Sequence, residues 1–158
     1  MSWDHPSPFI EQRHVIDAHI DGLQHTNNGV YVMWCGEAAW AHSQSLGLGL
    51  AEYQALDRAM AVTEAKYNYL RATRVGDVLK IGTWIAGWDS KLTMERRFQI
   101  IHAETGHTVL RASMIFACIE ISSGRPRRMP QAFIDGYEPA VLATRSSEAT
   151  DTPTEPSR

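Results

Sequence analysis

The segment that most constrains the fold is residues 30–46, which have the pattern of a long helix with apolar side chains on nearly every side. Tyr31, Trp34 and Cys35 follow the i, i+3, i+4 spacing of one helical face, yet Met33 lies on the opposite side. A helix that is apolar almost all round is stable in water only when other structure surrounds it. The rest of the chain is therefore expected to wrap this helix.

Strand patterns flank the helix on both sides. Residues 14–21 alternate apolar and polar side chains, which predicts a half-buried strand that ends at Asp21. Later patterns predict strands at 61–71, 78–88, 92–103 and 107–121, the last of them central, and short helices near 50–56 and 131–137. One strand, one buried helix and four consecutive antiparallel strands predict an α+β fold whose sheet curls round the helix.

Length and composition fit a single globular domain. The chain has 158 residues, of which 44% are hydrophobic and 21% are charged, and this is enough to bury a core without disulfides or metal. Residues 1–143 are expected to form that domain. Residues 144–158 are rich in Ser, Thr, Glu and Pro, so they are expected to form a disordered tail.

The same features argue against several partners and locations. A net charge of −3 argues against nucleic acid as a partner, and no apolar stretch approaches the roughly 20 residues of a membrane span. The first residues do not resemble a signal peptide. Cys35 and Cys118 lie in apolar runs, as small buried residues of a reducing compartment do. Together these features predict a soluble cytoplasmic protein.

A polar motif stands directly before the long helix. It places the carboxylate of Asp21 and the ring of His25 close to Asn27 and Asn28, which are residues that cap helix starts. The unpaired N–H groups at a helix start, with the positive end of the helix dipole, favour negative charge. A carboxylate beside such a terminus is unusual unless a group such as a polarised carbonyl lies between them.

The layout and the signature Asp21-x-x-x-His25-x-Asn27-Asn28-x-x-Tyr31 resemble the hot-dog-fold acyl-CoA thioesterases of the 4-hydroxybenzoyl-CoA thioesterase type. The resemblance covers about residues 9–137. Further matches in the same order are Gly76-Asp77, Ser90-Lys91 and Arg125-Pro-Arg127-Arg128-Met-Pro130.

This resemblance implies a hot-dog fold, in which a curved antiparallel sheet wraps around a long central helix. It also implies a homodimer or homotetramer with active sites at the subunit interface. The implied reaction is hydrolysis of an acyl-CoA thioester to a free acid and CoA, with no metal and no organic cofactor.

At the matching positions, the resemblance implies that Asp21 is a nucleophile or a general base, since one carboxylate can act in either role. Main-chain N–H groups at the helix start, chiefly that of Asn28, would stabilise the negative charge on the thioester oxygen. His25 would orient Asp21, contact the thioester or hold the loop. A purely structural interpretation makes Asp21 a turn residue, and Asn27 and Asn28 helix caps.

The phosphates of CoA need cations, because the ribose phosphate and the pyrophosphate are negatively charged. Arginine offers a planar fork that suits phosphate. The residues predicted to bind substrate or CoA are Asn27, Ser90, Lys91, Arg125, Arg127 and Arg128, with Arg71 and Arg74 as further candidates. The structural alternative is a solvated charged loop.

Two departures from the family pattern stand out. Gln24 occupies a loop position where the family usually has Gly, so the loop must form without a residue that tolerates positive φ. Gly36 lies inside the helix, where many relatives carry an acidic residue, and either makes room for an acyl group or a neighbouring helix, or weakens a polar contact. Glu37 and Glu64 are weaker candidates for the catalytic carboxylate.

Two other functions are compatible with this fold. Acyl-CoA hydratases and dehydratases also pair an acid with a histidine, although usually without the Asn-Asn helix cap. A non-catalytic acyl-CoA-binding module is the third possibility. Release of free thiol separates the thioesterase from both.

Overall fold

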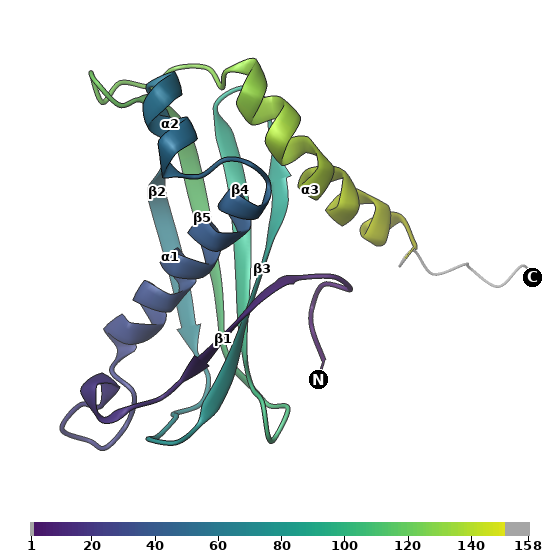
Figure 1. Ribbon diagram of the computed structural model, residues 1–158. Helices are drawn as coiled ribbons and strands as arrows, with labels where there is room; N and C mark the ends of the chain where they lie inside the picture. The colour runs from purple at the N-terminus through teal and green to yellow at the C-terminus, as the bar shows by residue number, and fades with distance from the viewer. Residues whose placement is uncertain (1, 151–158) are drawn as a thin grey trace, which may run out of the picture.

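The computed structural model describes residues 2–150, and side chains as far as Thr144. Its elements are β1 (Phe9–His14), the 3₁₀ helix η1 (Asp17–His19), α1 (Asn28–Ser45), α2 (Leu50–Leu56), β2 (Arg58–Tyr69), β3 (Val78–Trp88), β4 (Thr93–His102), β5 (Thr108–Glu120) and α3 (Gln131–Thr150). The strands form one antiparallel sheet in the order β1-β3-β4-β5-β2. Helix α1 lies across one face of this sheet (Figure 1). The predicted α+β hot-dog fold is confirmed.

The core lies between α1 and the concave face of the sheet. Helix α1 contributes Trp34 and Cys35, and the sheet contributes the buried faces of its inner strands, such as Ile81 of β3 and Phe98 of β4. Helix α3 adds Phe133 and other apolar residues at one end. Burial raises the pKa of the Cys35 thiol to about 12, so this cysteine acts as a small apolar residue, as the sequence predicts.

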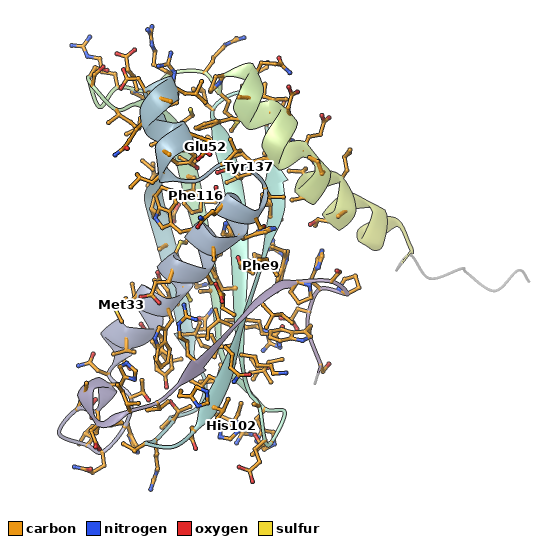
Figure 2. All side chains as sticks on the ribbon, in the orientation of Figure 1. Phe9, Met33, Glu52, His102, Phe116 and Tyr137 are labelled. Carbon is orange, nitrogen blue, oxygen red and sulfur yellow. The ribbon has the colours of Figure 1, made fainter. Side chains whose placement is uncertain are left out.

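The outer side of α1 is less covered than its composition predicts. Val32, Met33 and Trp40 remain 38%, 50% and 46% exposed, and Met33 projects away from the sheet (Figure 2). Strand β2 is an edge strand of the sheet, and Val62 on it is 53% exposed. A single chain therefore wraps only one side of its central helix.

The first strand was predicted in the wrong place. Residues 14–21 do not form a strand, because Phe9–His14 pairs with β3 and the following residues form a loop with a 3₁₀ turn. Ile16 is 53% exposed, so the apolar alternation of this segment does not mark a buried face. Asp21 consequently lies in the loop before α1 and not at the tip of a strand.

The last helix is longer than predicted. Helix α3 runs over Gln131–Thr150, and it extends away from the end of the sheet where it begins (Figure 1). Residues 144–150, expected to begin a disordered tail, are therefore helical. The remainder of that predicted tail lies outside the described residues.

Candidate active site at the start of α1

The loop before α1 closes into a tight turn. The Asp21 N–H donates to the His25 carbonyl over 2.9 Å, and the Gln24 N–H donates to the Asp21 carbonyl over 3.1 Å. Gln24 has φ +64°, which lies in the left-handed region that costs an L-residue about 1 kcal/mol or more. The loop therefore keeps a glycine-like backbone at this position although the residue is Gln.

Helix α1 begins with a side-chain cap. The Asn27 Oδ1 accepts the Gly29 N–H over 2.9 Å, and Asn27 itself is extended at φ −59°, ψ 135°. Asn28 is the first residue of the helix, and no hydrogen bond found among residues 2–150 uses its N–H. The predicted capping role belongs to Asn27, and the main-chain N–H of Asn28 is free to bind an acceptor.

Buried hydroxyl groups tie this helix start to the sheet. Thr26 bonds to Thr73 through its N–H over 2.9 Å and through its hydroxyl over 2.7 Å. The Tyr31 hydroxyl bonds to the same Thr73 hydroxyl over 2.6 Å. These bonds fix the loop and the first turn of α1 against the segment that follows β2.

A cavity of about 280 Å³ opens at this point. The lining residues of this turn cavity are Asp21, Leu23, His25, Thr26, Asn28, Tyr31, Tyr69, Leu70, Arg71 and Ala72. The structure thus brings Asp21, His25 and Asn28 to one cavity, although Asp21 is not on a strand. The Oδ1 atom of Asp21 accepts the Leu23 N–H over 2.9 Å, so the carboxylate also has the turn role that the structural interpretation gives it.

A second and larger cavity, of about 460 Å³, runs between α1 and the sheet. Its lining residues are Val32, Gly36, Ala39, Trp40, Ser43, Tyr53, Met60, Val62, Ala65, Tyr67, Met94, Arg96, Met114, Phe116 and Tyr137. This apolar cavity passes Gly36, where a Cβ would meet no atom within 4 Å. The missing side chain therefore leaves open space inside the protein, in agreement with the first interpretation of Gly36.

Sequence reasoning missed the polar residues at one end of the apolar cavity. Arg96 is only 1% exposed, and it lines the cavity with Ser43, Tyr53 and Tyr137. One signal was available in the sequence: Arg96 alternates with the apolar residues Met94 and Phe98. In a strand such an alternation places all three side chains on one face, which here is the buried face.

Five of the residues predicted to bind substrate or CoA lie at the other end of the sheet, namely Ser90, Lys91, Arg125, Arg127 and Arg128, whereas Asn27 caps the start of α1. The turn at Ser90 and Lys91 meets the basic segment after β5, because the Met129 N–H donates to the Lys91 carbonyl over 2.8 Å. Arg127 pairs with Glu120 at 2.9 Å, and Arg125 and Arg128 are exposed. The loop before α1, whose residues line the turn cavity, lies at the opposite end of the sheet (Figure 1), so one chain does not bring the two groups together.

The weaker candidate residues are placed elsewhere. Glu37 forms an exposed ion pair with Arg13 at 3.0 Å, and Glu64 is exposed on β2. Arg71 lines the turn cavity, and Arg71 and Arg74 line a neighbouring polar cavity of about 390 Å³. Both of the further candidate cations, Arg71 and Arg74, therefore lie at the end of the molecule that contains Asp21.

No helix among the described residues has both the length and the apolar character needed to cross a bilayer. Within the same residues, no group of three or more His, Cys, Asp or Glu side chains is arranged to hold a metal ion.

Solved structures share this architecture. A 1,4-dihydroxy-2-naphthoyl-CoA thioesterase from Synechocystis superposes with a TM-score of 0.74 at 22% identity, covering 83% of this chain and 96% of its own. A Staphylococcus aureus protein, SAV2348, solved in complex with CoA, gives a TM-score of 0.79 at 18% identity, covering 98% and 94%. The probable thioesterase YbaW from Escherichia coli superposes with a TM-score of 0.71 at 24% identity, covering 84% of this chain and 98% of its own. At these identities the likeness shows the fold.

Sequence comparison agrees with the fold. Protein THEM6 of Danio rerio is 34% identical over 80 residues, which span 50% of this chain and 39% of that relative. The chain thus matches well under half the length of this curated relative. The family model of the thioesterase-like superfamily matches residues 16–136, which is well over half of the chain. The protein therefore belongs to the thioesterase-like superfamily.

Proposed function

We propose that this protein is an acyl-CoA thioesterase, which hydrolyses an acyl-CoA thioester to a free acid and CoA in the cytoplasm. The observation that supports this most strongly is the turn cavity, which is lined by both Asp21 and Asn28, the first residue of α1. A thioester carbonyl between these groups has an attacking group on one side and a donor for its oxygen on the other.

Asn28 acts through its main chain. As the carbonyl carbon is attacked, negative charge develops on the thioester oxygen, and the N–H of Asn28 donates to that oxygen. The dipole of α1, 18 residues long, adds positive potential at the same point. A donor of this kind typically contributes about 2.7–4 kcal/mol to lowering the barrier.

Asp21 supplies the attack in one of two ways. As a general base it takes a proton from water, which then adds to the carbonyl carbon and expels the CoA thiolate. As a nucleophile its own oxygen adds to the carbonyl carbon, the C–S bond breaks with release of the CoA thiolate, and water hydrolyses the resulting anhydride to the free acid and the Asp21 carboxylate. The Oδ1 bond to the Leu23 N–H at 2.9 Å orients the carboxylate in both cases, and His25 borders the same cavity.

A second copy of the chain supplies the predicted phosphate-binding cations. Strand β2 has 12 residues and spans about 40 Å, which separates Asp21 from Arg127 and Arg128 within one chain. Antiparallel pairing of two β2 edges across a twofold axis places the Arg58 end of one copy beside the Tyr69 end of the other. The basic segment of the partner then lies near the turn cavity, and the exposed apolar side of α1 becomes covered.

A free-thiol assay with a panel of acyl-CoA thioesters tests the proposal. Wild-type protein is expected to release CoA from part of the panel, and Asp21→Asn is expected to reduce kcat at least a hundredfold while its circular dichroism spectrum is unchanged. The Glu37→Gln variant is the matched control and should keep full activity. Hydration of an enoyl-CoA without thiol release, or binding without turnover, would contradict the thioesterase assignment. Size-exclusion chromatography with light scattering should show a dimer or tetramer.

A further inference from the structure

The guanidinium of Arg96 is a buried positive charge without a carboxylate partner. Arg96 is 1% exposed, and no ion pair to it is found among the described residues. Its Nη1 donates to the Nδ1 of His42 over 2.7 Å and to the Thr83 hydroxyl over 3.3 Å, while its Nε has no hydrogen-bond partner. A buried charge of this kind is costly unless an anion or strong acceptor reaches it.

The groups beside Arg96 do not neutralise it. Burial and the nearby Arg96 charge lower the pKa of His42 to about 4, so this ring is neutral at pH 7 and accepts the arginine N–H. Burial raises the pKa of both Tyr53 and Tyr137, which keeps the two phenols uncharged. Burial lowers the pKa of Arg96 to about 10, which still leaves the guanidinium charged at neutral pH.

Hydroxyl groups extend this polar region along the cavity wall. The Ser43 hydroxyl donates to the Leu48 carbonyl over 2.6 Å and bonds to the Tyr137 hydroxyl over 2.6 Å. The Tyr53 hydroxyl bonds to Tyr137 in turn. Tyr137 lies at the end of the molecule far from His102 (Figure 2), which is also the end far from the turn cavity.

The rest of the apolar cavity suits a carbon chain. Its wall is formed by side chains such as Val32, Met60 and Met114, and no Asp or Glu is among the described residues that line it. Along α1 the lining extends from Val32 to Ser43, which is about 16 Å of helix. Since an extended carbon chain advances roughly 1.3 Å for each bond of about 1.5 Å, about 12 carbons fill that length.

We infer that the apolar cavity binds a chain of about 12 carbons. The end of that chain carries a carboxylate or a similar oxygen acceptor, which Arg96 holds. This inference deepens the proposed function, because it gives the acyl group of the thioester a polar distal end. The same chemistry could come from a free carboxylic acid, so the experiment has one arm for each source.

The binding arm needs no hydrolysis. Dissociation constants of dodecanoic acid and methyl dodecanoate are measured by calorimetry on the wild-type protein. The acid is expected to bind at least about tenfold more tightly, since a hydrogen bond to a charged group contributes about 1.5–3 kcal/mol. Arg96→Gln should abolish this preference and Arg96→Lys should keep part of it. The matched control is Arg97→Gln, which removes an exposed charge from the next position of β4 and should leave the preference intact.

The kinetic arm identifies the source of the acceptor. The thioester carbonyl lies at Asn28, four residues or about 6 Å before Val32 along α1, so the acyl chain needs about four carbons more than the cavity holds. The mono-CoA thioester of hexadecanedioic acid is therefore compared with hexadecanoyl-CoA, and kcat/KM is expected to favour the former at least tenfold in wild type and Arg97→Gln but not in Arg96→Gln. A preference in binding alone assigns the cavity to a free acid. Equal binding of acid and ester to the wild-type protein overturns the inference, even if Arg96→Gln does not fold. If the wild-type protein hydrolyses no thioester of the acyl-CoA panel, the proposed function fails and the binding arm still decides this inference.

Discussion

The two ends of α1 present different kinds of positive potential. At its start, the N–H of Asn28 and the helix dipole offer partial charges beside the Asp21 carboxylate. Near its end, the half-buried His42 accepts from Arg96, a buried full charge that pairs with no carboxylate in the part of the chain whose side chains are described. Partial charges suit an oxygen that gains negative charge only during a reaction. A full buried charge suits a ligand that carries its own acceptor before the reaction begins.

The largest effect is expected from removing one N–H at the start of α1. Asn28→Pro should fold, because proline is tolerated at the first helical position and Asn27 already has the extended backbone that precedes proline, at ψ 135°. The lost donor should lower kcat about 10²–10³-fold. Asn28→Ala keeps the N–H and should keep kcat, so an equal loss in both variants would place the effect in the side chain.

The exposed arginines at the far end of the sheet should affect CoA binding less strongly. Arg127→Ala combined with Arg128→Ala is expected to raise KM for a CoA thioester about tenfold, since exposed ion pairs contribute about 0.2–1 kcal/mol each. The pantetheine thioester of the same acyl group should be unaffected. The charge-matched control is Arg97→Ala combined with Arg111→Ala, which removes two positive charges elsewhere on the sheet. Equal losses for both thioesters would exclude a phosphate-binding role.

The pH dependence of stability tests the buried end of α1. The folded state holds the pKa of His42 at about 4, below its ordinary 6.5, so the unfolded chain binds a proton more readily. The contribution of the neutral His42 ring to the free energy of unfolding is therefore complete above pH 6.5 and is lost as the pH falls towards 4. Allowing for partial exposure of the ring, we expect a contribution of about 1 kcal/mol.

Urea denaturation across this pH range measures that contribution. His42→Gln retains an acceptor for Arg96 but has no titrating ring, so its free energy of unfolding should vary less between pH 6.5 and 4. If the free energy of unfolding falls equally with pH in the wild-type protein and in His42→Gln, groups other than His42 cause the pH dependence.

The smallest effect is expected in the loop before α1. Gln24→Gly should raise the free energy of unfolding by about 0.5–1 kcal/mol, because relief of the left-handed strain at φ +64° exceeds the extra entropy of glycine in the unfolded chain. Gln24→Ala keeps the strained backbone and should give no gain. If both variants stabilise the protein equally by thermal denaturation, backbone strain is not the cause.

Strand β1 shows why part of the fold could not be predicted. On the side of this edge strand that faces the protein lie Glu11 and Arg13, and Arg13 pairs with Glu37 of α1 at 3.0 Å. Polar residues on the inner side hide the apolar alternation that identifies a strand. Residues 78–88, in contrast, are buried or half-buried at every position of β3, and their predicted bounds equal the observed ones.

The sequence alone determined the central helix, the four later strands and the closeness of Asp21 to the start of α1. These features depend on local patterns, and only a few residues separate Asp21 from Asn28 along the chain. The tertiary structure decided the rest. It placed Arg96 of β4 beside Tyr137 of α3, and it put the surface arginines at the end of the sheet far from Asp21. Contacts between segments distant in sequence depend on how the sheet curves and packs, and no local pattern contains that information.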